Sequence, residues 1–111
     1  MKLTSKNYEE LNEVMGDNTR LEFDGGVVVF KTTKGSFLVE KDDNPVVAVS
    51  PDNEVFVMPQ ENTTAVRYRI NQFLPKSVKL TSKNSVMMLN GKPLKKYNMV
   101  TPDGNIMMED E

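Results

Sequence analysis

The sequence of 111 residues contains no cysteine, no histidine and no tryptophan. Without cysteine, the chain forms no disulfide, has no thiolate nucleophile and offers no cysteine-type zinc site. Without histidine, it lacks the commonest general base and the commonest side-chain metal ligand. These absences exclude most hydrolytic, redox and zinc chemistry, and they leave carboxylates, lysines, tyrosines and hydroxyls as the reactive groups.

Long apolar runs are also missing. No run approaches the roughly 18 residues that a membrane-spanning helix needs. The first ten residues contain no apolar segment of the kind found in secretory signals. Hydrophobic residues make up 38% of the chain in short runs, which is typical of a globular protein. We therefore expect a single domain over residues 1–111, located in the cytoplasm and making no membrane contact.

A third absence is local, because residues 62–102 contain no Asp or Glu. This acid-free segment carries eight bases: Arg67, Arg69, Lys76, Lys79, Lys83, Lys92, Lys95 and Lys96. Residues 1–61 hold 12 acids and 6 bases, and residues 103–111 hold 4 acids and no base, so charges of −6, +8 and −4 sum to −2. Such segregation creates a local field that attracts an anionic partner despite the net charge.

Residues 1–61 predict a helix followed by hairpins. Capping oxygens at Asn7 and just before it precede Tyr8, Leu11 and Met15, whose three- and four-residue spacing is helical. Short β-branched and aromatic runs separated by turn residues then predict strands over 19–23, 27–33, 36–40, 46–50 and 54–58. The continuous apolar run 27–30 predicts a strand covered on both faces, and 41–45 predicts a polar connection.

The acid-free segment predicts a second helix and further hairpins. The helix begins at Asn62 or Thr63 and ends before Pro75. Its apolar face holds Val66, Ile70, Phe73 and Leu74. This face is flanked by Arg67 and Arg69. The side chains expected to point away from the fold are Tyr68, Asn71 and Gln72. Strands are predicted over 78–80, 86–89, 97–101 and 106–108, and Pro93 indicates an edge strand. The predicted fold class is therefore α+β, an antiparallel sheet of hairpins with two helices packed against it.

The acid-free segment has two interpretations. Its bases form a surface that contacts an anionic partner, or they are paired in the fold with acids from the rest of the chain. Nucleic acid is one such partner, because lysines neutralise phosphates while Tyr68 and Tyr97 stack on bases. The segment has no RNA-recognition aromatic signature and no glycine-rich basic loop.

Two other groups of residues attract attention. The first group consists of acids in the first helix and in later segments: Glu9, Glu10, Glu13, Asp42, Asp43, Asp52 and Glu54. These acids could contact a basic partner. Their presence is explained equally simply by solubility and by favourable placement near the start of the helix. Methionines gather near the end of the chain and suit either a surface that repacks around a partner or an irregular core: Met87, Met88, Met99, Met107 and Met108. We favour the core, because Met87 and Met88 adjoin apolar residues of a predicted strand.

No complete catalytic or metal-binding motif is present. Gly91-Lys92-Pro93 lacks the other residues of a phosphate-binding loop, and Asp42-Asp43-Asn44 lacks the spacing of a calcium loop. We therefore expect a protein that is not an enzyme and that has no cofactor, no metal site and no catalytic residue. A carboxylate-dependent enzyme, or a Mg²⁺ or Ca²⁺ site made of carboxylates alone, is the alternative that the residue types leave open. Residues 2–7 and 79–84 share the hexapeptide Lys-Leu-Thr-Ser-Lys-Asn, and because their flanks diverge we favour coincidence over duplication.

Residues 46–74 contain a valine-rich hairpin, 46–49 with 55–57, followed by a helix with Thr63-Thr64, Arg67, Ile70-Asn71 and Phe73-Leu74. This stretch resembles small proteins of phages and other mobile elements. Several such small cysteine-free proteins bind and block a host enzyme or defence complex. The resemblance implies a similar activity here, by analogy.

The expected function is that of a non-enzymatic binding protein, encoded by a phage or another mobile element. It would inhibit or modulate a host nucleic-acid-handling or defence protein through charge-complementary surfaces. The alternative is direct nucleic-acid binding by residues 62–102. The expected partner-binding residues are Arg67, Tyr68, Arg69, Gln72, Lys76, Lys79 and Lys83. Glu9, Glu10 and Glu13 are the acidic alternative.

Overall fold

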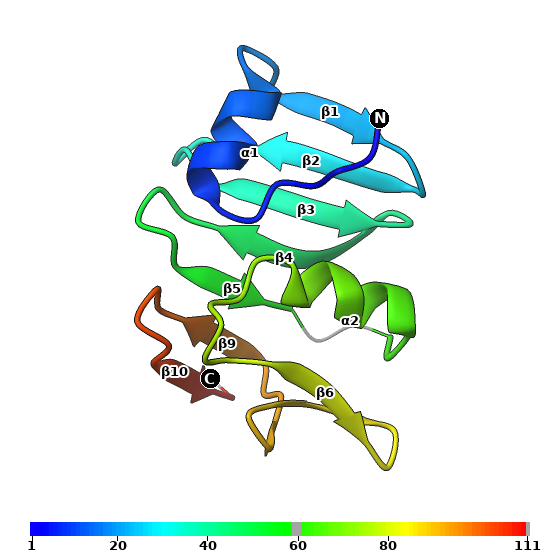
Figure 1. The fold of residues 1–111 in the computed structure, drawn as a ribbon, viewed down its shortest axis with the longest axis vertical. Helices are drawn as coiled ribbons and strands as arrows, with labels where there is room; N and C mark the ends of the chain where they lie inside the picture. The colour runs from blue at the N-terminus through cyan, green and yellow to red at the C-terminus, as the bar shows by residue number, and fades with distance from the viewer. Residues whose placement is uncertain (59–60, 111) are drawn as a thin grey trace.

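A computed structural model describes residues 1–58 and 61–110, which contain two helices, α1 (Tyr8–Met15) and α2 (Thr64–Asn71), and ten strands. Seven strands form an antiparallel sheet in the order β1 (Arg20–Phe23), β2 (Val27–Lys31), β3 (Phe37–Lys41), β4 (Asn44–Val49), β5 (Val55–Val57), β9 (Tyr97–Val100) and β10 (Ile106–Glu109) (Figure 1). A smaller sheet contains β6 (Leu80–Lys83), β7 (Val86–Leu89) and β8 (Lys92–Pro93). The predicted α+β class, with hairpins and two packed helices, is confirmed.

Both helices begin at the capping residues that the sequence predicts. The Asn7 side chain accepts a hydrogen bond from Glu10 N at 2.9 Å, and the Thr63 hydroxyl accepts one from Val66 N at 3.1 Å. These bonds satisfy backbone donors that the first helical turn leaves free. Asn53 in the β4–β5 turn also accepts from Tyr8 N at 2.8 Å, which fixes the start of α1 against the sheet.

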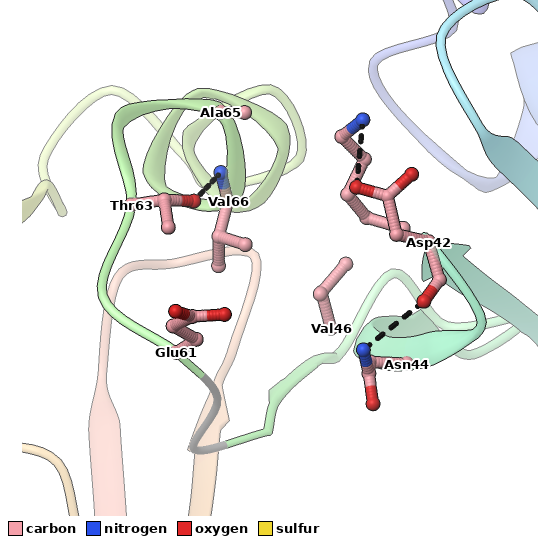
Figure 2. A pocket seen from close by; sticks show the side chains of 8 residues that line it. Asp42, Asn44, Val46, Glu61, Thr63, Ala65 and Val66 are labelled. Atoms are coloured by element: carbon pink, nitrogen blue, oxygen red, sulfur yellow. Dashed lines mark hydrogen bonds and ion pairs between the residues drawn. The ribbon is translucent and has the colours of Figure 1, made fainter.

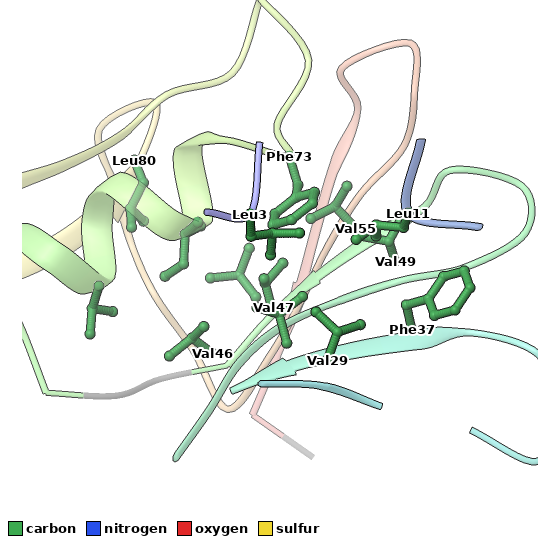
Figure 3. Close-up of a cluster of buried hydrophobic side chains, with 14 of the residues drawn as sticks. Leu3, Leu11, Val29, Phe37, Val46, Val47, Val49, Val55, Phe73 and Leu80 are labelled. Atoms are coloured by element: carbon green, nitrogen blue, oxygen red, sulfur yellow. The ribbon is translucent and has the colours of Figure 1, made fainter. Parts of the chain in front are cut away.

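The hydrophobic core lies between one face of the large sheet and both helices (Figures 1 and 3). The register places Val29, Val39 and Val47 side by side on this face, and all three are fully buried. Leu11 from α1 and Ile70 from α2 cover the row. The helices and the first residues of the chain pack on the same face, so the sheet has one buried face and one open face.

Some local predictions are wrong. The run 27–30 is not covered on both faces, because Val28 and Phe30 lie on the open face and are half-buried. The polar connection predicted at 41–45 is only a two-residue turn, since Asp42 and Asp43 adopt φ values of 51° and 68° and Asn44 already belongs to β4. The strand predicted at 78–80 instead spans Leu80–Lys83, because a similar turn follows it and pairs it with β7.

The clustered methionines divide between the two faces of the fold. Met87 is buried in the core and Met108 packs against that core, as the core interpretation predicts. Met107 is 55% exposed, which contradicts this interpretation for its side chain. Pro93 lies in the edge strand β8, as predicted. In the described ranges, neither helix is long and apolar enough to cross a membrane.

Candidate partner-binding groove

An open groove of about 540 Å³ lies beside the C-terminal half of α2. Its basic residues are Lys6 from the segment before α1 and Lys76 and Lys79 from the connection between α2 and β6. Tyr68, which is 68% exposed, lies with them. The described residues that complete the lining contain no acid: Asn71, Gln72, Leu74, Pro75 and Val78. We call this feature the lysine groove.

Two neighbouring amides hold the elements around the groove. The Asn71 side chain donates to Leu80 O at 2.9 Å and accepts from Leu80 N at 2.8 Å. Gln72 Nε2 donates to Leu3 O at 3.1 Å and to Ser5 O at 2.6 Å. The prediction that Asn71 and Gln72 point away from the fold is wrong, because their side chains satisfy backbone groups on either side of α2.

The repeated hexapeptide supplies both of these backbone partners. Its first copy, residues 2–7, precedes α1, whereas its second copy, 79–84, contains the whole of β6 and enters a turn. Leu3 and Leu80 occupy equivalent positions in the two copies and are both buried. Ser5 is buried but its counterpart Ser82 is exposed, so the two copies differ in structure although both bind α2.

Replacing Asn71 with alanine should lower the free energy of unfolding by about 1–3 kcal/mol, because both backbone groups of the buried Leu80 lose their partner. Urea titration followed by circular dichroism measures this change. Asn12→Ala is the matched control, since Asn12 is an exposed residue of α1. Equal stability of the two variants would contradict the bridging role of Asn71.

The two arginines of α2 make contacts within the fold. Arg69 Nη1 donates to Leu3 O at 3.0 Å, while its Nε is buried without a partner among the described residues. Burial lowers the pKa of Arg69, and the nearby Tyr68 acts in the opposite direction. Arg67 donates to Asn62 Oδ1 and to the Thr64 hydroxyl. Both arginines are half-buried: Arg69 connects α2 to the N-terminal segment, whereas Arg67 bonds to residues at the start of α2 itself.

The six lysines of the acid-free segment are all exposed. Three ion pairs are found within residues 1–58 and 61–110: the Met1 amino group with Asp24, Arg20 with Glu22, and Lys41 with Asp42. Each lies outside the acid-free segment, so across the described chain none of the eight bases is paired with an acid. The interpretation in which acids pair with these bases is therefore wrong for this part of the protein.

Of the seven predicted binding residues, four line the lysine groove: Tyr68, Gln72, Lys76 and Lys79. Arg67 and Arg69 belong to α2 but are not in the groove lining, and Lys83 is exposed at the end of β6, outside the groove. Sequence reasoning missed Lys6, because it precedes the acid-free segment and no local pattern connects it to α2. Among the acids, Glu9 accepts from the Asn53 amide and Glu10 from Lys6 N, which are structural contacts.

A second pocket, of about 290 Å³, lies between the N-terminus of α2 and the β3–β4 turn (Figure 2). Asp42 and Glu61 are the acids of its lining, and Asp42 is paired with Lys41 at 3.2 Å. Over the described ranges, no group of three or more acids gathers as a candidate metal site. The pocket therefore offers two carboxylates, one of them already paired with a lysine.

Comparisons with protein-family models, with curated proteins and with solved structures give no match.

Proposed function

We propose that this protein is a non-enzymatic binding protein that engages an acidic surface of another protein through the lysine groove. The observation that carries the proposal is the convergence of Lys6, Lys76 and Lys79 around an exposed Tyr68 without an acid in the described lining. The partner class expected from the sequence, a host protein that handles nucleic acid or acts in defence, remains part of the proposal.

The charge arrangement supports binding of an anion. Opposite charges at a surface interact by about 1 kcal/mol at 4 Å in bulk water, and more as an interface excludes water. Among the described residues, no acid lines the groove or is ion-paired with one of its lysines, so the three ammonium groups are open to an incoming carboxylate. Complementary charge of this kind raises the rate of association and selects among partners.

Single-stranded nucleic acid is the second candidate, and the exposed tyrosines favour it. Tyr68 is 68% exposed beside the groove lysines, and Tyr97 is 54% exposed with the Lys96 ammonium 5.5 Å from its ring centre. Exposed aromatic rings next to lysines allow bases to stack while phosphates are neutralised.

A pull-down from nuclease-treated lysate separates the two candidates. The tagged protein should recover one protein in stoichiometric amount, and the triple variant Lys6→Glu/Lys76→Glu/Lys79→Glu should lose it. The control variant Lys92→Glu/Lys95→Glu/Lys96→Glu changes the net charge by the same amount, but none of its three lysines lines the groove. It should therefore retain the partner. If a partner is recovered from untreated lysate but not from nuclease-treated lysate, the groove binds nucleic acid and the proposed protein partner is rejected. Equal loss in both variants would contradict the role of the groove.

A further inference from the structure

The open face of the large sheet carries an unexpected row of side chains. The register pairs Phe30 with Leu38, Leu38 with Ala48, and Ala48 with Phe56. It continues from Phe56 to Met99 and from Met99 to Met107. Because paired residues of antiparallel strands point to the same face, these side chains form one continuous line across six strands. We call it the apolar stripe: Phe30, Leu38, Ala48, Phe56, Met99 and Met107.

The apolar stripe is accessible to solvent. Phe56 is 37% exposed and Met107 is 55% exposed, while the other members are half-buried between their neighbours. Both helices pack on the opposite face, as Figure 1 shows, and the buried core lies there. An antiparallel sheet with one face in water normally carries polar residues on that face. A continuous exposed apolar row with polar neighbours instead marks an interaction surface.

Polar residues border one side of the stripe, whereas acids alternate with Val28 and Tyr97 on the other side. On one side the hairpins place Thr32 opposite Ser36, Ser50 opposite Glu54 and Thr101 opposite Asn105. On the other side lie Glu22, Val28, Glu40, Tyr97 and Glu109. Two bases accompany these four acids: Arg20, which is paired with Glu22 at 2.9 Å, and Lys96, which lies over the Tyr97 ring. The border therefore has a net charge of −2, from four acids and two bases.

We propose that the apolar stripe binds an amphipathic α-helix of a partner protein whose apolar face is flanked by lysine or arginine. Five strand spacings of about 4.8 Å make the stripe about 24 Å long. A helix of about 16 residues has the same length. Beside this one continuous row, Val28 and Tyr97 are isolated apolar or aromatic border residues, separated by acids. The stripe therefore matches the narrow apolar face of a helix better than a second sheet, which would require several continuous apolar rows.

The acidic border selects this occupant over two others. In a face-to-face dimer, the acids that border one copy would oppose the acids of the other, which is unfavourable. An anionic membrane surface would be repelled in the same way. Basic residues flanking a helix would instead meet Glu40, Glu54 and Glu109. This surface is separate from the lysine groove and does not depend on the function proposed for it.

A designed peptide of 18 residues, with leucines on one face and lysines on its flanks, serves as the probe. Fluorescence anisotropy should show that this peptide binds the full chain at least about tenfold more tightly than a peptide in which glutamates replace the lysines. A tenfold difference in affinity corresponds to about 1.4 kcal/mol. Phe56→Ser/Met107→Ser removes apolar area without altering charge and should weaken binding at least about tenfold. Val86→Ser is the matched control, because Val86 is 42% exposed but lies on β7, outside the stripe.

Three outcomes would overturn the proposal. The first is equal binding by the wild type and the Phe56→Ser/Met107→Ser variant. The second is equal binding of the lysine and glutamate peptides. The third is a wild-type dimer in sedimentation that this variant dissociates, which would make a second copy the occupant. If circular dichroism shows that the variant is unfolded, Glu40→Lys/Glu109→Lys tests charge selection alone, and unchanged peptide preference would equally reject the proposal.

Discussion

Replacing Phe37 with alanine should destabilise the protein by about 3–5 kcal/mol, the range observed for removal of buried aromatic side chains. Phe37 is 0% exposed at the start of β3, and its ring lies 5.0 Å from that of Tyr8. Tyr8 in turn donates from its hydroxyl to Gly35 O at 2.8 Å, so the ring pair joins α1 to the β2–β3 turn. The loss is a large share of the roughly 5–15 kcal/mol that stabilise a typical domain.

Urea titration followed by circular dichroism measures this change, and Phe56→Ala provides the matched control. Both substitutions remove a phenylalanine ring from the same sheet, but Phe56 points to the open face and is 37% exposed. We expect the control to lose only about 1 kcal/mol, because less apolar area leaves a buried environment. If both variants lose the same stability, the assignment of buried and open faces is wrong.

Structure that depends on neighbouring residues could be predicted from the sequence. Asn7 and Thr63 are helix caps because a side-chain oxygen reaches a backbone donor three residues ahead. Asn and Gly readily accept the positive φ of a tight hairpin turn, and Asn90 and Gly91 adopt φ values of 48° and 81° between β7 and β8. These signals lie within a few residues of the structure that they specify, so no knowledge of the tertiary fold is needed.

Contacts between distant segments could not be predicted in this way. A helical wheel places Gln72 on a polar face, but only the fold shows that Leu3 O and Ser5 O lie within its reach. The same reason explains why Lys6 was missed as part of the lysine groove. The apolar stripe depends on the pairing of β5 with β9, which a long stretch of chain separates, so its continuity also needs the register.

The charge pattern illustrates both what the sequence can predict and what it cannot. The absence of acids from residues 62–102 is visible in the sequence, but its effect depends on where the acids of other segments lie. In the described ranges they do not pair with the bases of this segment, and all six of its lysines are exposed. The arginines, which the sequence places in the same group, instead make hydrogen bonds within the fold.

The triple variant Lys6→Glu/Lys76→Glu/Lys79→Glu should weaken binding of a labelled deca-glutamate peptide about 100-fold at low salt. Each exposed ion pair contributes about 0.2–1 kcal/mol, and reversal replaces each attraction by a repulsion of similar size. Over three positions the change is about 1–6 kcal/mol, and about 2.7 kcal/mol corresponds to 100-fold. Fluorescence anisotropy measures the affinity. Lys92→Glu/Lys95→Glu/Lys96→Glu should have a smaller effect, because none of these three lysines lines the groove.

A Tyr68→Ala variant then decides which anion the groove recognises. A peptide carboxylate needs the lysines but not the exposed ring, so deca-glutamate binding should change little. Stacking of a base on an aromatic ring contributes about 1–3 kcal/mol, so binding of a 12-nucleotide single-stranded DNA would weaken about 5- to 150-fold if Tyr68 served as its platform. We expect the DNA to bind no better to the wild type than to Tyr68→Ala, because the proposed partner is an acidic protein surface. A selective loss of DNA binding in Tyr68→Ala would assign the lysine groove to nucleic acid instead.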